Sequence, residues 1–87
     1  MPKLTPVFLV KISSPDEIIW EGEAKSLSSQ NSAGAFDILP EHANFVTIIN
    51  EGAPIKISRA DGENRIFTFK TAVVSIVDGF VNIYVDI

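Results

Sequence analysis

The sequence predicts an all-β fold, arranged as a sandwich or barrel of short strands. β-Branched and aromatic residues gather in short runs, and none of these runs shows the 3.6-residue period of an amphipathic helix. Gly, Pro, Asn, Asp and Ser cluster between the runs at the close spacing typical of all-β domains. The chain of 87 residues is 46% hydrophobic, so we expect one domain over residues 1–87 with one core.

The expected strands follow these runs in chain order. They cover residues 7–12, 18–20, 24–28, 45–49, 54–58, 65–70, 72–77 and 80–87. The turns expected between them cover residues 13–17, 28–34, 50–52, 61–62 and 78–79. The five glycines stand singly, so each is interpreted as a turn residue and none as part of a phosphate-binding motif. Trp20 is expected to be a core or half-buried strand residue.

The last hairpin has the clearest register, because Asp78-Gly79 suits a two-residue type I′ turn. This turn sets Ile76 opposite Val81 and Val74 opposite Ile83, and one face of the hairpin becomes wholly apolar. The other face has a mixed composition, which suits partial exposure or contact with a second protein. Its residues are Val73, Ser75, Val77, Phe80, Asn82 and Tyr84.

The preceding hairpin allows two registers. A two-residue Asp61-Gly62 loop would set Lys56 opposite Phe67 and so mix polar with apolar residues. A longer loop over residues 60–64 sets Ile57 opposite Phe67 and keeps the faces separate. We therefore predict the longer loop, with a solvated tip.

Composition argues against several kinds of partner and cofactor. The formal charge of -4 would repel nucleic acid and anionic lipid on average. No apolar run approaches the roughly 20 residues that span a bilayer, and residues 1–6 lack the apolar core of a signal peptide. The chain has no cysteine. We expect a soluble, unexported protein with neither disulfides nor a cysteine-built metal site.

The lone histidine, His42, lies in the most individual segment of the chain, residues 34–43. A histidine base needs a nucleophile and an orienting group, and the sequence offers no nucleophile motif. Asp37 and Glu41 flank the histidine, but acidic residues beside a proline in a loop are commonly solvated. The segment is therefore interpreted as a contact loop, with His42 either an inert surface residue or a partner contact. We expect no catalytic residue, metal or cofactor.

Core residues are expected to anchor this loop. Phe36, Ile38 and Leu39 are the candidates for that anchoring. Pro40 would fix the direction of the chain, because its ring restricts φ. These residues shape the loop in this interpretation and do not themselves carry chemistry.

The order of motifs resembles the epsilon subunit of F-type ATP synthase, in its N-terminal domain. The resemblance depends on Trp20-Glu21-Gly22-Glu23-Ala24, then Gly34-x-Phe36-x-Ile38-Leu39-Pro40-x-His42-Ala43, then Asn50-Glu51-Gly52 and a closing hairpin. It implies a flattened β-sandwich of roughly ten short, mostly antiparallel strands. It also implies a rotor-stalk protein that binds the gamma subunit and the polar loops of the c-ring, and that catalyses nothing itself.

Site residues are implied by the same resemblance, position by position. Gly34, Ala35, Phe36 and Asp37 correspond to a turn beside the c-ring, whereas His42 and Thr47 fall on the gamma side. Ser14 is a further gamma-side candidate. Some residues depart from the family pattern: Ala35 replaces a frequent acid, Asp37 and Glu41 replace small residues, and Asn44 replaces a frequent proline.

The resemblance also sets the expected location and its alternatives. The protein would act peripherally on the cytoplasmic side of the bacterial inner membrane, or in the equivalent organelle compartment, without a small-molecule substrate. Relatives commonly continue into two C-terminal helices that restrain ATP hydrolysis, and we expect no such inhibition from this polypeptide. One alternative is a free-standing β-sandwich adaptor for another protein. A lipoyl or biotinyl carrier is disfavoured, because neither Asp61-Gly62 nor Asp78-Gly79 has a lysine beside it.

Overall fold

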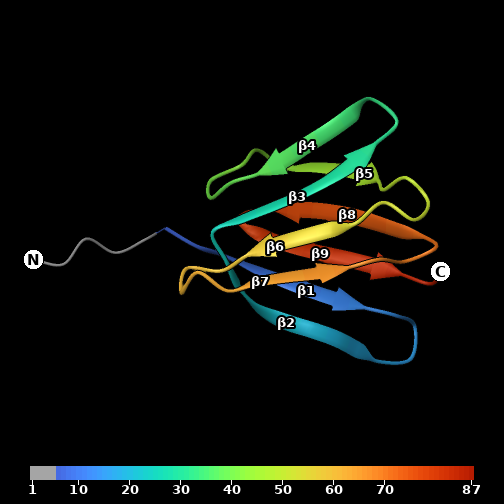
Figure 1. The fold of residues 1–87 in the computed structure, drawn as a ribbon, viewed down its shortest axis with the longest axis horizontal. Coiled ribbons are helices and arrows are strands. Elements are labelled where there is room, and N and C mark those ends of the chain that lie inside the picture. The colour runs from blue at the N-terminus through green and yellow to red at the C-terminus, as the bar shows by residue number, and fades with distance from the viewer. Residues whose placement is uncertain (1–5) are drawn as a thin grey trace, which may run out of the picture.

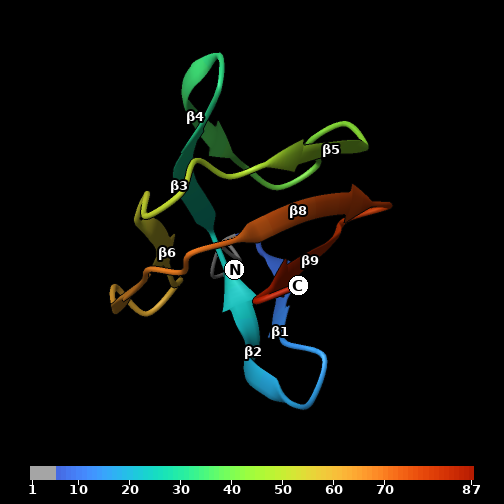
Figure 2. The same cartoon turned by 90° about the vertical axis from the view of Figure 1, so that its right-hand side faces the viewer.

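The computed structural model describes residues 6–87, and within this range the chain forms nine strands and no helix. The strands lie in two stacked sheets (Figures 1 and 2). Their bounds are β1 Phe8–Ser13, β2 Ile18–Ala24, β3 Ser26–Asn31, β4 Gly34–Ile38, β5 Phe45–Ile48, β6 Ile55–Ser58, β7 Asn64–Phe67, β8 Ala72–Val77 and β9 Phe80–Val85. The predicted all-β sandwich is confirmed, with nine strands where the resemblance implies roughly ten.

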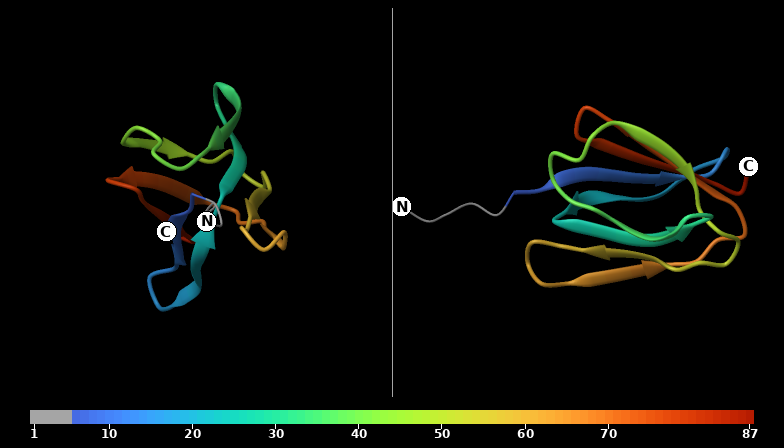
Figure 3. Two further views of the ribbon diagram at one scale, coloured as in Figure 1. Left: turned by 90° about the vertical axis from the view of Figure 1, so that its left-hand side faces the viewer. Right: turned by 90° about the horizontal axis from the view of Figure 1, so that it is seen from above.

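Each sheet has its own order of strands. The larger sheet runs β2-β1-β9-β8-β5, and the smaller one runs β4-β3-β6-β7. All pairs are antiparallel except β1 with β9, which are parallel. The first and last strands of the chain therefore meet in the middle of the larger sheet, as the end-on views in Figures 2 and 3 show.

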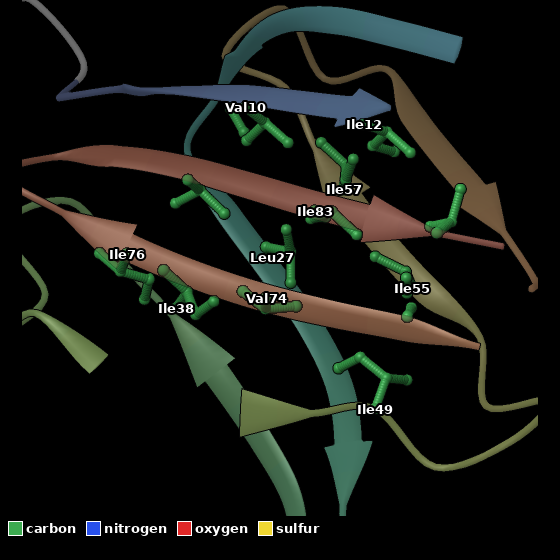
Figure 4. Close-up of a cluster of buried hydrophobic side chains, with 14 of the residues drawn as sticks. Val10, Ile12, Leu27, Ile38, Ile49, Ile55, Ile57, Val74, Ile76 and Ile83 are labelled. Carbon is green, nitrogen blue, oxygen red and sulfur yellow. The ribbon is translucent and has the colours of Figure 1, made fainter. Parts of the chain in front are cut away.

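The core fills the space between the two sheets. Alternate residues of β1, β8 and β9 point inward and are buried, which is the period of two that a half-buried strand requires. They pack on Leu27, Ile55 and Ile57 of the smaller sheet (Figure 4). Ser29 is buried too, and its hydroxyl donates a hydrogen bond of 3.0 Å to the carbonyl of Pro54. This buried polar group is therefore satisfied.

The register predicted for the β8–β9 hairpin is confirmed. Ile76 pairs with Val81, Val74 with Ile83, and the turn comprises Asp78 and Gly79. The φ angles of these two turn residues are 48° and 82°. Two successive positive φ values define a type I′ turn, whose twist matches that of the flanking strands.

The register predicted for the β6–β7 hairpin is wrong by two residues. Ile57 lies opposite Arg65, and Ile55 lies opposite Phe67. The hairpin closes over residues 59–63, because the Arg59 amide donates a 2.8 Å hydrogen bond to the Glu63 carbonyl. β7 is an edge strand on which Arg65 is exposed, so an apolar partner for Ile57 is not required there. The face of each side chain was nevertheless predicted correctly, because a shift of two residues preserves it.

Two predicted boundaries in residues 18–34 are also wrong. The chain passes from the larger to the smaller sheet at Lys25, whose amide donates a 2.8 Å hydrogen bond to the Ser58 carbonyl. The expected strand 24–28 is thus divided between β2 and β3. Most of the expected turn 28–34 belongs to β3, since the polar Ser28 and Gln30 pair with β4. Polar residues here mark the outward side of a strand and not a turn.

Aromatic pairs close the two open edges of the sandwich. Trp20 on β2 packs on Phe67 of β7, with ring centroids 6.1 Å apart. At the other edge, Phe36 on β4 packs on Phe45 of β5 at 6.1 Å and 77°. Each pair joins an edge strand of one sheet to an edge strand of the other. The prediction that Trp20 is at least half buried is confirmed.

Gly22 is not a turn residue, contrary to the prediction. It lies inside β2, and a Cβ built on it would lie 2.8 Å from the Trp20 ring. The glycine is therefore required because the indole folds back over its backbone. The other glycines, Gly34, Gly52, Gly62 and Gly79, all have positive φ, as turn or strand-end residues do.

Candidate contact surfaces

The segment over residues 34–43 is not one loop. Its first half, Gly34–Ile38, is strand β4, which pairs along its length with β3. The predicted turn over Gly34, Ala35, Phe36 and Asp37 is therefore wrong, apart from Gly34, which follows the turn at residues 32–33. The β-branched count of this segment is low, which is why the sequence did not indicate a strand.

β4 divides its residues between two faces. Ala35 and Asp37 point outward from the sandwich, and the Asp37 carboxylate accepts a 2.6 Å hydrogen bond from the Ser28 hydroxyl. Phe36 points inward against Phe45. The outward residues are exposed, so they are available to a partner at this edge of the smaller sheet.

The residues expected to anchor the loop behave differently from one another. Ile38 is 1% exposed and joins the core, and Phe36 is half buried against it. Leu39 is 56% exposed, so its predicted core role is wrong. Pro40 begins a turn that the His42 amide closes with a 3.1 Å hydrogen bond to the Leu39 carbonyl. Leu39 directly follows the buried Ile38, so the alternation along β4 accounts for its outward side chain.

The turn over residues 39–42 contains a strained residue. Glu41 has φ of 66°, and a positive φ at the third position, after proline at the second, is the geometry of a type II turn. Glycine is the usual residue there, because a side chain at positive φ costs on the order of 1 kcal/mol. Glu41 stands where the family often has a glycine, and the backbone keeps the positive φ that suits a glycine.

His42 is half buried at this end of the sandwich, with its ring centroid 5.3 Å from that of Phe45. Its Nδ1 lies 2.8 Å from the Ala43 carbonyl oxygen, so Nδ1 carries a proton and donates it to that carbonyl. In the neutral ring Nε2 is then an acceptor. His42 is part of the wall of a pocket of about 490 Å³. The other residues of this wall are Pro6, Val7, Phe8, Pro40, Glu41, Asn44, Asp78 and Gly79.

Asn44 ties the His42 segment to the β8–β9 turn. The Asp78 amide donates a 2.8 Å hydrogen bond to the Asn44 side-chain oxygen. The Asn44 amide group donates a longer one of 3.4 Å to the Asp78 carboxylate. A proline at this position could make neither bond, so the departure of Asn44 from the family pattern has a structural role here.

The three predicted gamma-side residues do not form one cluster. His42 lies beside Phe8, at the start of β1, whereas Ser14 follows the end of β1. In Figure 1 the β4–β5 connection and the β1–β2 turn lie at opposite ends of the molecule. Thr47 faces into the sandwich, where its hydroxyl accepts a 3.0 Å hydrogen bond from the Asn31 side chain.

The larger sheet carries an exposed apolar surface, of which the sequence analysis predicted only a part. We call it the outer face: it consists of the side chains of β1, β9, β8 and β5 that point away from the core. The sequence predicted its central part from the last hairpin. Leu9, Val46 and Ile48 extend it, and the alternation of residues 7–12 and 45–49 was the signal that could have found them.

Grouped metal ligands and membrane-spanning helices are both absent from the part of the chain that the structure describes. Among residues 6–87, no three His, Cys, Asp or Glu side chains are grouped as metal ligands would be. In the same range no helix is long and apolar enough to cross a membrane. The fold and these surfaces together define the class of protein: an all-β sandwich sealed by aromatic pairs, with its distinctive residues on exposed ends and on one apolar face.

The comparison with known proteins identifies the family. Residues 7–87 match the family described as the beta-sandwich domain of the ATP synthase Delta/Epsilon chain, and the chain belongs to this family. An ATP synthase epsilon chain from Clostridium botulinum (strain Eklund 17B / Type B) is 32% identical over 81 residues. That alignment covers 93% of this chain and 60% of the relative. One from Bordetella petrii is 32% identical, over 88% of this chain and 54% of the relative.

Solved structures share the fold. A chain in the mitochondrial ATP synthase of Euglena gracilis, with OSCP, F1 and c-ring, superposes with a TM-score of 0.83 at 15% identity. The match covers 97% of this chain and 53% of that one. A chain of the central stalk and c-ring of the Tetrahymena thermophila enzyme superposes with a TM-score of 0.72, over 98% and 66% of the two chains. The chain thus spans little more than half to two thirds of its relatives.

Proposed function

We propose that this domain is a central-stalk component of an F-type ATP synthase, and that it couples rotation of the c-ring to ATP synthesis by binding the gamma subunit and the ring. The observation that carries the proposal is the family match over residues 7–87. The domain has no catalytic role of its own, since it acts by holding two partners together. It works peripherally at the membrane surface, on the cytoplasmic side of a bacterial inner membrane or in the equivalent organelle compartment.

The gamma subunit would contact the end of the sandwich that carries His42. The pocket there is lined by the apolar Phe8 and Pro40 and by the polar Asn44, and Nε2 of the neutral ring is an acceptor. A hydroxyl or amide donor of gamma would satisfy it. Thr47 does not reach this end, because its hydroxyl is engaged inside the sandwich with Asn31, which pairs with Gly34 at the β3–β4 end.

The c-ring would contact the β3–β4 hairpin, at the other end. Gly34 and Ala35 are exposed there, and Asp37 is held by Ser28 on the same outward side. A small residue at position 35 allows close approach of a polar loop, whereas a large one would hold it away. The ring contact in this chain therefore depends on shape more than on a carboxylate at position 35.

Binding of gamma is the decisive measurement. We would titrate the domain with the cognate gamma subunit by calorimetry, and expect saturable binding with one domain per gamma. Absence of binding at high micromolar concentration would remove the stalk proposal and leave the adaptor alternative, in which the same fold serves another protein. His42→Ala should weaken binding by about 1 kcal/mol, the value of one hydrogen bond, and a thermal melt shows that the variant remains folded.

A reconstituted synthase tests the ring contact separately. Ala35→Arg should lower proton-driven ATP synthesis, because the long side chain prevents close approach to the ring loops. The calorimetric affinity for gamma should stay the same, since position 35 lies at the far end from His42. Unchanged synthesis with Ala35→Arg would contradict the proposed ring contact.

A further inference from the structure

Two hairpin tips of this domain consist of an aspartate followed by a glycine. They are Asp61-Gly62, between β6 and β7, and Asp78-Gly79, between β8 and β9. In such a pair the backbone nitrogen of the glycine can attack the side-chain carboxyl carbon of the aspartate, because glycine has no Cβ to hinder the approach. Each tip is therefore a candidate site for the rearrangement of aspartate to isoaspartate.

This rearrangement needs no reagent other than water. The bond from the glycine nitrogen to the aspartate Cγ forms as the Cγ–OH bond of the protonated carboxyl group breaks, and the hydroxyl leaves as water together with the amide proton. The product is a succinimide ring. Water then opens the ring at either carbonyl: attack at the side-chain carbonyl restores aspartate, and attack at the main-chain carbonyl gives isoaspartate.

The tip at Asp61 is held only by residues of its own loop. The Gly62 amide donates a 3.0 Å hydrogen bond to the Arg59 carbonyl, and the Glu63 amide donates one of 2.9 Å to the Asp61 carboxylate. The Arg59 amide closes the loop on the Glu63 carbonyl at 2.8 Å. The strand that follows, β7, is an edge strand. Opening this tip therefore breaks hydrogen bonds within residues 59–63 alone.

The tip at Asp78 is tied to a different element. The Asp78 amide donates a 2.8 Å hydrogen bond to the side-chain oxygen of Asn44, which lies in the β4–β5 connection. The Asn44 amide group donates a longer one of 3.4 Å to the Asp78 carboxylate. The flanking strands β8 and β9 both lie inside the larger sheet. Opening this tip separates it from Asn44, so it is less favourable than opening the other tip.

Solvent access and glycine geometry do not distinguish the two tips. Asp61 and Asp78 are both exposed. Gly62 and Gly79 have φ of 90° and 82°, and a Cβ built on either would meet no atom within 4 Å. The difference between the tips is therefore the link to Asn44.

Ring closure proceeds from a locally opened tip. At Asp61 the native hydrogen bonds engage both the carboxylate and the Gly62 amide, and these bonds must break before the nitrogen can attack. The rate therefore follows the free energy of local opening, which is low for segments held by few contacts. A tip with only its own loop bonds should react faster than one linked to a second element.

We propose that Asp61 is a site of spontaneous isoaspartate formation, and that Asn44 protects Asp78 from the same reaction. This inference does not depend on the proposed function, because it concerns the chemistry of the tips alone. Isoaspartate keeps one free carboxylate, so the charge of the domain does not change. It adds one carbon atom to the main chain between Arg59 and Glu63, which alters the geometry of the 2.8 Å hydrogen bond that closes the loop.

Peptide mapping of the aged domain tests the proposal. The folded domain is kept for weeks at neutral pH and physiological temperature in water enriched in heavy oxygen, and it is then digested with trypsin in ordinary water. Asp61 lies in the tryptic peptide 60–65 and Asp78 in the peptide 71–87. Each passage through the succinimide adds one heavy oxygen atom, which fragment ions locate by mass. We expect labelling at Asp61 to be at least about fivefold faster than at Asp78.

Two variants provide the controls. Asp61→Glu needs a larger ring for the same attack, so it should abolish labelling at position 61 and leave labelling at Asp78 unchanged. Asn44→Ala removes the link to the second tip, and it should make labelling at Asp78 at least about fivefold faster without changing that at Asp61. Thermal melts show whether each variant is folded. If Asn44→Ala is not folded, the comparison of the two tips in the unsubstituted domain still decides the proposal.

The unfolded chain gives the reference rates. In guanidinium chloride Asp61 and Asp78 should be labelled at similar rates, because the hydrogen bonds to Asn44 are lost. A difference that persists there would show that the local sequence sets the rates, and it would overturn the proposal. Labelling of the folded domain that is equal at the two tips, or faster at Asp78, would also overturn it. Labelling at Asp78 that a folded Asn44→Ala variant does not accelerate would overturn the protective role of Asn44.

Discussion

At the scale of single residues, the contact between Trp20 and Gly22 determines how the β2 edge closes. The indole lies over Gly22 on the inward side of β2 and reaches Phe67 of the opposite sheet. A methyl group at position 22 would lie 2.8 Å from the ring, so the indole would have to move. One glycine thus permits the aromatic pair that seals this edge.

Gly22→Ala should lower the free energy of unfolding by about 1–3 kcal/mol, the usual cost of overpacking. Trp20 is the single tryptophan, so a shift in its emission should accompany the loss. Glu23→Ala, the next residue on the outward side of the same strand, is the control and should change stability by less than about 0.5 kcal/mol. In a Trp20→Leu background, Gly22→Ala should lower the free energy of unfolding by less than it does alone, because the indole is no longer there to clash. Fully additive effects in this double-mutant cycle would exclude the steric explanation.

Glu41 shows a second constraint at this scale. It holds a positive φ that suits glycine, so Glu41→Gly should raise the free energy of unfolding by about 1 kcal/mol. Glu51→Gly makes the same exchange at an exposed turn residue whose φ is not positive, and it should lower stability by about 0.5–1 kcal/mol through chain entropy. Urea unfolding of both variants measures the two changes, and equal signs would contradict the strain at Glu41.

At the scale of elements, the Asn44–Asp78 hydrogen bonds join the β4–β5 connection to the β8–β9 turn. Asn44→Ala should cost about 1 kcal/mol, since it leaves the Asp78 amide without its 2.8 Å acceptor. Amide exchange at Asp78 should become faster, while exchange in the centre of β8 should not change. Asn82→Ala, on the outer face, is the control. Unaltered exchange at Asp78 in the Asn44 variant would show that the connection is held by packing alone.

The sequence predicted elements well where apolar residues alternate and poorly where polar residues form edges. The β8–β9 register followed from turn chemistry together with apolar matching, and both constraints agreed. For β6–β7 the matching rule failed, because exposed Arg65 lies opposite Ile57 on an edge strand. β4 was predicted as a loop, since Gly34, Ala35 and Asp37 have little strand preference. Its partner β3 and the inward Phe36 hold it extended, and those contacts are tertiary.

For the candidate contact surfaces, the sequence predicted some of the residues correctly but did not predict where they lie relative to one another. His42 and Pro40 lie at an exposed end, as a contact loop requires, but Leu39 points outward because it follows the inward Ile38 of β4. Thr47 and Ser14 came from the resemblance, and register places one inside the sandwich and the other at its far end. Such separations depend on strand pairing, which a motif does not encode.

At the scale of the whole molecule, the parallel pairing of β1 and β9 ties both ends of the described chain into one core. Ile12 on β1 lies opposite Ile83 on β9, and both are fully buried. In the larger sheet, β2 pairs with β1, and β8 with β5 beyond it is joined to the sheet by β9. Loss of packing between β1 and β9 should therefore destabilise the whole sandwich and not one hairpin. Pairing of segments so distant in sequence is also slow, so we expect folding in milliseconds to seconds.

Ile83→Ala should therefore lower the free energy of unfolding by about 2–5 kcal/mol, the cost of a large-to-small change in a closed core. Trp20 fluorescence at the β2 edge and circular dichroism of the whole sheet should report one coincident urea transition, shifted to lower concentration. Ile66→Ala, at an exposed position of β7, is the matched control and should change stability by less than about 0.5 kcal/mol. If the Ile83 variant instead gave two separate transitions, with Trp20 unaffected by the first, the two sheets would unfold independently. The β1–β9 pair would then be a local contact, and it would not unite the fold.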